Sequence, residues 1–365
     1  MRTAFYNGRI FTGEKFIENA VVEGTVITSG DALPGARIDL RGGILAPAFI
    51  DLQLYGGNNQ LFGEHPSVEA LKATLDYSFS GGTTLILPTV ATNSQQTMLA
   101  AIEAVREYWD KGFPGVAGLH LEGPFISPAK RGAHIPGFIK KPTLQDAEEL
   151  MRAGKGIIKM MTLAPEVCPP EVISYLQDNG VIISAGHTDA TFEQAFNNNI
   201  TLATHLFNAM SPLQHRAPGM VGAILYNENV QATIIADGHH VDYPVIAIAK
   251  KIMGERLLLI TDAVTTNTSG VYQHQLKGDK YVMPDGTLSG SALTMLKAVR
   301  NCVEHVGISL EESLRMASLY PARVLRLDHK RGRIEKGYDA ELIWLNEKLE
   351  LKGVYTNGSL THMPA

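Results

Sequence analysis

Residues 157–189 read IIKMMTLAPEVCPPEVISYLQDNGVIISAGHTD and contain the unit that decides the fold. An apolar run at 157–166 precedes a helix-like segment at 169–179, and a second apolar run follows at 181–189. Strands that are buried on both faces read as continuous apolar runs rather than as alternating patterns. A strand, a helix and another strand in this order predict a parallel βαβ unit.

The same rhythm continues on both sides of this unit. Six more apolar runs lie at 48–56, 83–92, 116–124, 201–208, 231–238 and 256–264. Further helix-like segments lie at 67–80, 95–111, 143–153, 191–198 and 243–254. Eight such runs predict an α/β fold with a (β/α)8 TIM-like barrel. An open doubly wound sheet is the alternative, but polar residues at the end of run after run favour the barrel.

The two ends of the chain differ from this middle part. Both consist of short strand-like pieces with turns and show no helical period. We therefore expect a small β-sandwich domain formed by both chain termini, residues 1–46 plus 331–365, beside a barrel domain at 47–330. Within the latter, the Gly-rich stretch 265–290 indicates a hairpin excursion, and two helices are expected near 291–306 and 310–319.

Composition excludes several classes of protein. With 365 residues, 45% of them hydrophobic and 19% charged, the chain can bury a substantial core and is not globally disordered. A net charge of −5 without a basic block argues against binding to nucleic acid or to anionic membranes. The N-terminal stretch has no signal-peptide pattern, and no apolar run reaches the ~18 residues of a membrane span. Cys168 and Cys302 are too few for a disulfide framework, so we expect a cytoplasmic protein.

Acidic and imidazole side chains follow several of the predicted strands. The candidates are Glu122, His187, His205 and Asp262, with Asp237, His239 and His240 near the end of the seventh run. In a barrel, the carboxyl ends of the strands meet at one mouth, so these side chains are expected to converge. One carboxylate, two imidazoles and a water form a catalytic zinc arrangement, and a further carboxylate beside them suits general base work.

Each of these residues also has a structural interpretation. A single histidine at a strand end is usually satisfied by hydrogen bonds, Glu122 could open a turn, and Asp189 reads as a helix N-cap. The joint placement of four candidates at one predicted face favours a metal site over these separate explanations.

Several motifs in one order carry a family resemblance. They are HLEGP (120–124), GHT (186–188), THLFNAM (204–210), DGHHV (237–241) and TDA (261–263), together with PAFID (47–51) and SGSALTM (289–295). Over nearly its whole length the chain resembles the N-acetylglucosamine-6-phosphate deacetylase family of the amidohydrolase superfamily. The resemblance implies metal-dependent hydrolysis of the N-acetyl group of N-acetylglucosamine 6-phosphate to glucosamine 6-phosphate and acetate.

The resemblance also implies roles at the reacting end of the substrate. Glu122, His187 and His205 would hold one divalent ion per subunit, which we expect to be Zn²⁺, with Fe²⁺ or another ion left open. Asp262 would take a proton from the attacking water and deliver it to the amine. His134 would reach the acetamide, where a donor stabilises the charge that develops on the carbonyl oxygen.

At the phosphate end, the resemblance implies contacts from Asn208 and from the backbone of Ala209, and a ligand contact from His240, which directly precedes Val241. Arg216 would reach the phosphate in the neighbouring subunit of a homodimer, where its planar fork suits phosphate. The loop at 126–140 is our candidate for closure over the site, because it carries His134 and several Gly and Pro residues.

One position departs from the superfamily pattern. Amidohydrolases commonly carry His-x-His at the end of the first strand, where this chain has Gln53 and Tyr55. An amide and a phenol are weak zinc ligands, so we expect one tightly held ion, with a weak second ion near Gln53 left open. Gln53 could instead bond a water there.

Two other functions remain as alternatives. The first is deacetylation of a related N-acetyl hexosamine 6-phosphate of the galactosamine or mannosamine type, because sequence poorly resolves sugar epimers. The second is a non-catalytic sugar-phosphate sensor that kept the barrel, although a pure binder would need neither the metal ligands nor the base.

Overall fold

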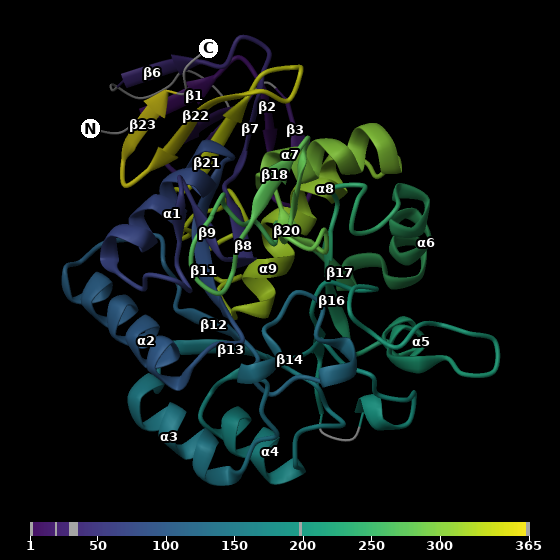
Figure 1. Cartoon of the computed structure of the whole chain (residues 1–365). Helices are drawn as coiled ribbons and strands as arrows, with labels where there is room; N and C mark the ends of the chain where they lie inside the picture. The colour runs from purple at the N-terminus through teal and green to yellow at the C-terminus, as the bar shows by residue number, and fades with distance from the viewer. Residues whose placement is uncertain (1–2, 19, 29–35, 197–198, 363–365) are drawn as a thin grey trace. The chain divides into compact units, whose positions relative to one another are not determined.

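Eight strands follow one another around a single sheet in the order in which they occur in the chain (Figure 1). They are β8 (Phe49–Leu54), β11 (Thr83–Ala91), β12 (Leu119–Glu122), β13 (Ile158–Leu163), β14 (Ile182–Ala185), β15 (Leu202–Ala203), β16 (Gln231–Ile235) and β17 (Leu257–Ile260). Each lies in one of the eight apolar runs, and the pairs from β11 to β17 are parallel. The computed structural model, which describes residues 3–18, 20–28, 36–196 and 199–362, thus confirms the predicted (β/α)8 barrel.

Backbone hydrogen bonds close the sheet between its first and last strands. The N–H of Asp262 donates to the carbonyl of Gln53 at 2.9 Å, and the N–H of Tyr55 donates to the carbonyl of Ala263 at 2.8 Å. Leu54 and Ala263 form a parallel bridge between these two bonds. Closure therefore takes place at the carboxyl ends of β8 and β17, where the polar candidates lie.

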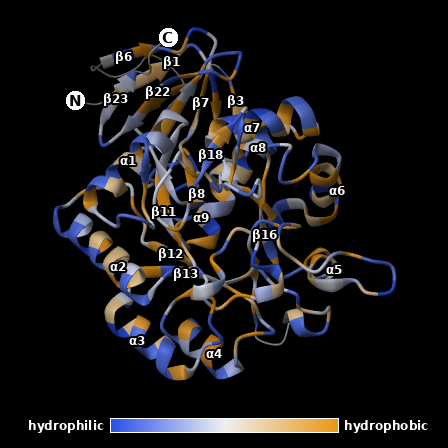
Figure 2. Cartoon of the chain, viewed as in Figure 1, coloured by the Kyte–Doolittle hydropathy of each residue, from blue (hydrophilic) through white to orange (hydrophobic). Residues whose placement is uncertain are grey.

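Helices connect most of the strands and pack outside them (Figure 1). They are α1 (Val68–Ser80), α2 (Gln95–Asp110), α3 (Leu144–Gly154), α4 (Pro170–Asp178), α5 (Gly219–Tyr226) and α6 (Tyr243–Met253). The helix α2 illustrates why these segments form helices that pack on the barrel. The Ser94 side chain caps its first turn by accepting the N–H of Thr97. Its buried face carries Met98, Ile102 and Val105 at helical spacing. Figure 2 shows the resulting two-sided colouring of α2, α3 and α4.

One expected helix is absent from the described part of the chain. The segment 191–198 contains only a 3₁₀ turn, η3 (Gln194–Phe196), and residues 197 and 198 lie outside the described residues. Three consecutive asparagines at 197–199 are poor helix formers, and Asn199 has a left-handed φ of 52°. The prediction of a helix here was wrong because the apolar spacing was given more weight than this propensity.

The segment after β17 forms the expected excursion and the helices that follow it. The strands β18 (Gln275–Lys277), β19 (Lys280–Val282) and β20 (Leu288–Ser291) make a three-stranded antiparallel sheet. The helix α7 (Met295–Asn301) continues into a π-helical turn, η5 (Cys302–Val306), and α8 (Leu310–Ala317) and α9 (Leu319–Val324) come next.

Packing divides the chain into two compact units. The first contains residues 1–51, 78–84 and 294–365, and the second contains residues 52–77 and 85–293. Residues 294–330, which we expected in the barrel domain, thus group with the two chain ends. All candidate site residues belong to the second unit.

Two sheets of the first unit share one apolar core. One sheet has the order β5-β4-β1-β6 and the other the order β23-β22-β21-β7-β2-β3. Their strands are β1 (Thr3–Tyr6), β2 (Arg9–Phe11), β3 (Phe16–Ile17), β4 (Val21–Glu23), β5 (Val26–Thr28), β6 (Ala36–Asp39), β7 (Ile44–Pro47), β21 (Leu342–Leu345), β22 (Leu351–Thr356) and β23 (Ser359–His362). Phe5 and Val22 of the first sheet cluster with Leu45, Leu342 and Tyr355 of the second, so both chain ends build this sandwich-like unit.

Candidate metal centre

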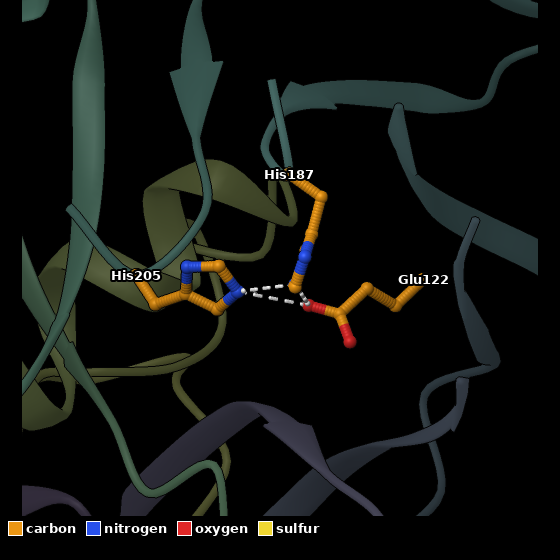
Figure 3. A group of neighbouring side chains, drawn as sticks. All are labelled: Glu122, His187 and His205. Atoms are coloured by element: carbon orange, nitrogen blue, oxygen red, sulfur yellow. Dashed lines mark hydrogen bonds and ion pairs between the residues drawn. The ribbon is translucent and has the colours of Figure 1, made fainter. Parts of the chain in front are cut away.

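Three ligand-type side chains from separate strand ends point toward one another (Figure 3). Glu122 is the last residue of β12, while His187 and His205 each lie two residues beyond the end of their strands, β14 and β15. The Nε2 atom of His205 lies 3.0 Å from Glu122 Oε1 and 3.1 Å from His187 Nε2, and His187 Nε2 lies 3.4 Å from Glu122 Oε1. All three residues are buried.

These separations fit a metal ion. Zinc bonds of about 2.0–2.2 Å at tetrahedral angles place neighbouring ligand atoms roughly 3.3–3.6 Å apart, so the three ligand atoms need to move apart by only a few tenths of an ångström. The Nδ1 atom of His187 lies 2.9 Å from the carbonyl of Lys130, which fixes the tautomer that presents Nε2 as a ligand. Burial raises the pKa of Glu122, but His187 and His134 outweigh burial and hold that pKa well below its usual value. The carboxylate is therefore ionised and ready to bind a cation.

The backbone around these side chains is strained. His187, His205 and Asp262 have positive φ angles of 47°, 35° and 55°. Residues other than glycine rarely adopt this left-handed conformation, and it costs on the order of 1–3 kcal/mol for each residue. At each position the chain turns sharply after its strand, which directs the side chain toward the others.

Asp262 lies beside the cluster, two residues beyond the end of β17. Its Oδ1 atom lies 2.9 Å from Gln53 Nε2 and 3.3 Å from the Tyr55 hydroxyl. Burial raises the pKa of Asp262, His205 opposes that increase, and the negative charge of Glu122 adds to it. A buried carboxyl with a raised pKa is a better proton acceptor than an ordinary aspartate.

Gln53 contacts protein groups directly, where a bond to a water had been one interpretation. Its Nε2 atom lies 2.8 Å from Glu122 Oε1, 2.8 Å from the Tyr55 hydroxyl and 2.9 Å from Asp262 Oδ1. The amide nitrogen carries two protons, so it can serve two of these three acceptors at a time. The Gln53 amide thus places hydrogen-bond donors between the carboxylates of Glu122 and Asp262.

His134 reaches the cluster from the loop that follows β12. Burial lowers the pKa of His134 to about 4, so the ring is neutral near pH 7. The backbone N–H of Thr92 donates to its Nδ1 at 3.2 Å, which leaves the ring proton on Nε2. Nε2 lies 3.0 Å from Glu122 Oε2 and is therefore a donor at the edge of the pocket.

Asp237 and His240 form a hydrogen-bonded pair whose side chains are largely buried. His240 Nδ1 lies 2.7 Å from Asp237 Oδ2, and Asp237 Oδ1 accepts the backbone N–H groups of His239 and His240 at 2.8 Å each. Burial raises the pKa of Asp237, but the hydrogen bond with His240 outweighs burial and lowers it. His240 lines the pocket, whereas His239 pairs with the exposed Asp279 at 2.9 Å.

Of the three residues expected at the phosphate end of the substrate, two line the pocket and one does not. Asn208 and Ala209 line the pocket, and Ala209 has a positive φ of 51°. Within the described ranges, no acceptor contacts the Ala209 N–H, so this group is available to an anion. Arg216 is exposed and does not line the pocket. The segment 211–218, which carries Arg216, projects away from the barrel before α5 (Figure 1).

One pocket connects these groups. Its volume is about 910 Å³, including the space at its open mouth. Its lining consists of the three residues of the cluster together with Asp262, His134 and His240. Tyr272 and His274 also line it, as do residues 288–290 of the excursion. Sequence reasoning gave these residues no role, because the excursion has no strand–helix rhythm that would place its side chains at the barrel mouth.

The amino-acid sequence of the chain is similar to those of known proteins. A model of the amidohydrolase family matches residues 44–361. The N-acetylglucosamine-6-phosphate deacetylase of Haemophilus influenzae is 36% identical over 360 residues, which covers 94% of this chain and 93% of the relative. The N-acetylgalactosamine-6-phosphate deacetylase of Shewanella sp. is also 36% identical, over 335 residues that cover 88% of this chain and 84% of the relative.

A solved structure extends the likeness to three dimensions. N-acetylglucosamine-6-phosphate deacetylase from Pasteurella multocida is similar to this chain with a TM-score of 0.94 and 34% identity, and the match covers 100% of both chains.

Among the residues that the structure describes, no helix is both long and apolar enough to cross a membrane.

Proposed function

The chain belongs to the amidohydrolase family, and from that premise we propose that it hydrolyses N-acetylglucosamine 6-phosphate to glucosamine 6-phosphate and acetate. The observation that carries this function is the gathering of Glu122, His187 and His205 within one pocket, with Asp262 beside them. Water attacks the amide carbonyl, the carbon–nitrogen bond breaks, and the amine leaves with the proton that the water gave up.

Glu122, His187 and His205 hold one divalent ion, which we take to be Zn²⁺ because a carboxylate with two imidazoles suits it. When bound, the ion polarises the amide carbonyl and lowers the pKa of water to roughly 7. Asp262 accepts the proton of the attacking water on its carboxylate and later delivers it to the leaving nitrogen. Its raised pKa suits both halves of this transfer.

His134 assists at the carbonyl oxygen. In this structure the neutral Nε2–H group, held in its tautomer by the backbone N–H of Thr92, donates to Glu122 Oε2. We propose that it turns from Glu122 to the carbonyl oxygen of bound substrate and stabilises the negative charge there as the water adds. The ring does not need to gain or lose a proton for this role.

The sugar phosphate extends toward Asn208 and Ala209. The N–H of Ala209 supplies a donor without charge, and the Asn208 amide, which donates to the carbonyls of His205 and Leu206 in this structure, would turn to the phosphate, while His240 contacts the sugar. Arg216 completes the site from a neighbouring subunit of a homodimer, since an exposed arginine on a projecting segment is placed to reach outward. Its guanidinium binds phosphate in a bidentate manner.

Cys168 and Cys302 are buried and form no disulfide, which supports a reducing compartment, so we place the reaction in the cytoplasm. A second substrate remains in the same class, because the Shewanella relative is named for N-acetylgalactosamine 6-phosphate. The two sugars differ in the orientation of one hydroxyl group.

Acetate release from the 6-phosphates of N-acetylglucosamine, N-acetylgalactosamine and N-acetylmannosamine, measured side by side with elemental analysis of the protein, tests the proposal. We expect one zinc per chain and the highest kcat/KM on the glucosamine compound. A higher value on the galactosamine compound would reassign the substrate. Tight binding by metal-replete protein without any acetate release would identify a sensor instead of an enzyme.

A further inference from the structure

The two carboxylate oxygens of Glu122 have different partners. Oε1 faces the imidazoles of His187 and His205, as Figure 3 shows, and also accepts a hydrogen bond from Gln53 Nε2 at 2.8 Å. Oε2 faces two donors, the Tyr55 hydroxyl at 2.5 Å and the Nε2–H of His134 at 3.0 Å. An ionised carboxylate oxygen offers about two lone-pair sites, so these two donors fill Oε2.

The Tyr55 hydroxyl has a defined direction. It carries one proton, and its oxygen lies 2.5 Å from Glu122 Oε2 but 3.3 Å from Asp262 Oδ1. The shorter contact takes the proton, because a phenol binds one acceptor strongly at a time. An ordinary phenol keeps its proton near neutral pH, so the hydroxyl can donate to this carboxylate oxygen.

We propose that Tyr55 is a positioning residue for the metal centre: its hydroxyl occupies Glu122 Oε2, so that the carboxylate meets the ion through Oε1 alone. Without the hydroxyl, Oε2 loses one of its two partners, and the carboxylate can rotate or bind through both oxygens. Groups that hold a metal ligand in place typically contribute 10–100-fold to metal affinity. The inference rests on the metal centre of the proposed function and is independent of the sugar substrate.

Tyr55→Phe tests this role, because it removes the hydroxyl and keeps the ring. Tyr108→Phe is the matched control, since Tyr108 is a buried tyrosine on α2 whose hydroxyl donates to the carbonyl of Pro114 at 2.8 Å, away from the pocket. The measurement is the zinc dissociation constant of each metal-free protein, by competition with a chromophoric chelator. Circular dichroism of the metal-free proteins checks folding.

We expect zinc binding by Tyr55→Phe to be 10–100-fold weaker than by the unmodified chain, and zinc binding by Tyr108→Phe to be unchanged. A dissociation constant of Tyr55→Phe within twofold of the unmodified value overturns the proposal. Equal weakening in both variants overturns it as well, because the loss would then follow from any buried hydroxyl.

The visible spectrum of the Co²⁺-substituted protein provides a second test, which reports the coordination number of the ion rather than its affinity. One carboxylate oxygen, two imidazoles and a water give a four-coordinate ion, whereas a carboxylate bound through both oxygens gives a five-coordinate ion. We expect the intense four-coordinate spectrum from the unmodified chain and a shift toward five-coordination in Tyr55→Phe. A five-coordinate spectrum from the unmodified chain contradicts the proposal.

These measurements distinguish a failure of the proposed function from a failure of the proposed role of Tyr55. A chain that binds zinc as expected but releases no acetate from any of the three sugar phosphates refutes the proposed function and leaves the role of Tyr55 intact. A chain that releases acetate while Tyr55→Phe binds zinc normally refutes the role of Tyr55 alone.

Discussion

At the residue scale, Asp262 occupies a position in which burial and neighbouring charges act on one carboxyl. Replacing it by Asn keeps the size and the contact with Gln53 but removes the proton acceptor. We expect the kcat of Asp262→Asn to fall by about 10²–10⁴-fold, the usual contribution of a general acid or base. Zinc content is expected to stay at one ion per chain, since Asp262 is outside the three-ligand cluster. Near-normal turnover with full metal content would refute the general-base role.

A second residue-scale prediction concerns Asp237. Its carboxylate orients His240 through a bond of 2.7 Å, and the same carboxylate accepts two backbone N–H groups. Asp237→Asn puts an amide in this place and weakens the hold on the ring tautomer, so we expect KM for the sugar phosphate to rise about 10-fold or more with a smaller change in kcat. Steady-state kinetics measure both constants. Equal loss in kcat and kcat/KM at constant KM would instead place His240 in the chemical step.

The residues of the cluster could be predicted from sequence, but their supporting contacts could not. Glu122, His187 and His205 follow apolar runs, and the barrel geometry alone brings strand ends together. Gln53 and Tyr55 were noticed only as departures from a motif, and nothing in their spacing indicates that both contact Glu122 and Asp262. Such contacts depend on rotamers and on the stagger of distant strands, which local sequence does not encode.

At the element scale, α3 provides a test of local stability. Thr143 caps the helix by accepting the N–H of Asp146, and the Asp146 carboxylate accepts the N–H of Thr143 in return. Thr143→Ala should lower the free energy of unfolding by about 1 kcal/mol, while Thr143→Ser, which keeps the hydroxyl, should lower it much less. Urea unfolding at neutral pH measures both. Equal losses in the two variants would rule out the cap as the cause.

The same cap has a pH dependence of known sign. Burial raises the pKa of Asp146, but bonds from Lys140 and Thr143 outweigh burial, so the folded pKa lies below the ordinary value of 3.8. Its contribution to stability is therefore present above the unfolded pKa and is lost as pH falls through the folded pKa. We expect the stability difference between Asp146→Asn and the unmodified chain to shrink below about pH 4, as measured by urea midpoints across pH. A difference that grows on acidification would contradict this assignment.

Element prediction succeeded where burial alone sets the pattern. The barrel strands are buried along most of their length, so their sequences are mostly apolar, and every one of the eight runs contains a strand. The prediction of a helix at 191–198 was wrong because a short, partly polar connection can satisfy its backbone hydrogen bonds in a turn as well as in a helix. The grouping of 294–330 with the chain ends could not be predicted, because the buried residues of α7, α8 and α9 do not indicate which unit they pack on.

At the scale of the whole molecule, the proposed homodimer makes a prediction that one subunit cannot satisfy alone. If Arg216 serves the neighbouring site, Arg216→Ala loses a charge-assisted contact to phosphate worth about 1.5–3 kcal/mol, so we expect a roughly 10–100-fold higher KM. Kinetics on the three sugar phosphates measure this change, with Lys277→Ala, an exposed cation of β18, as the matched control.

Mixing subunits tests the sharing itself. A heterodimer of Arg216→Ala and Asp262→Asn contains one complete site, in which the first chain supplies Asp262 and the second supplies Arg216. Co-refolding the two weak variants should restore acetate release to about half of the unmodified level per heterodimer, a figure that follows from one intact site in two. Activity that stays at the mean of the two variants would show that each chain uses its own Arg216 or none.

The closure of the barrel through Gln53 and Asp262 has a consequence for the order of events during synthesis. The backbone bond between these residues joins the first strand to the last, 209 positions later, and their side chains meet in the same pocket. A nascent chain that has emerged from the ribosome as far as residue 205, just beyond β15, carries Glu122, His187 and His205 but lacks Asp262. If Asp262 is the proton acceptor that we propose, amide cleavage begins only after translation has delivered the eighth strand, although all three proposed metal ligands are present earlier.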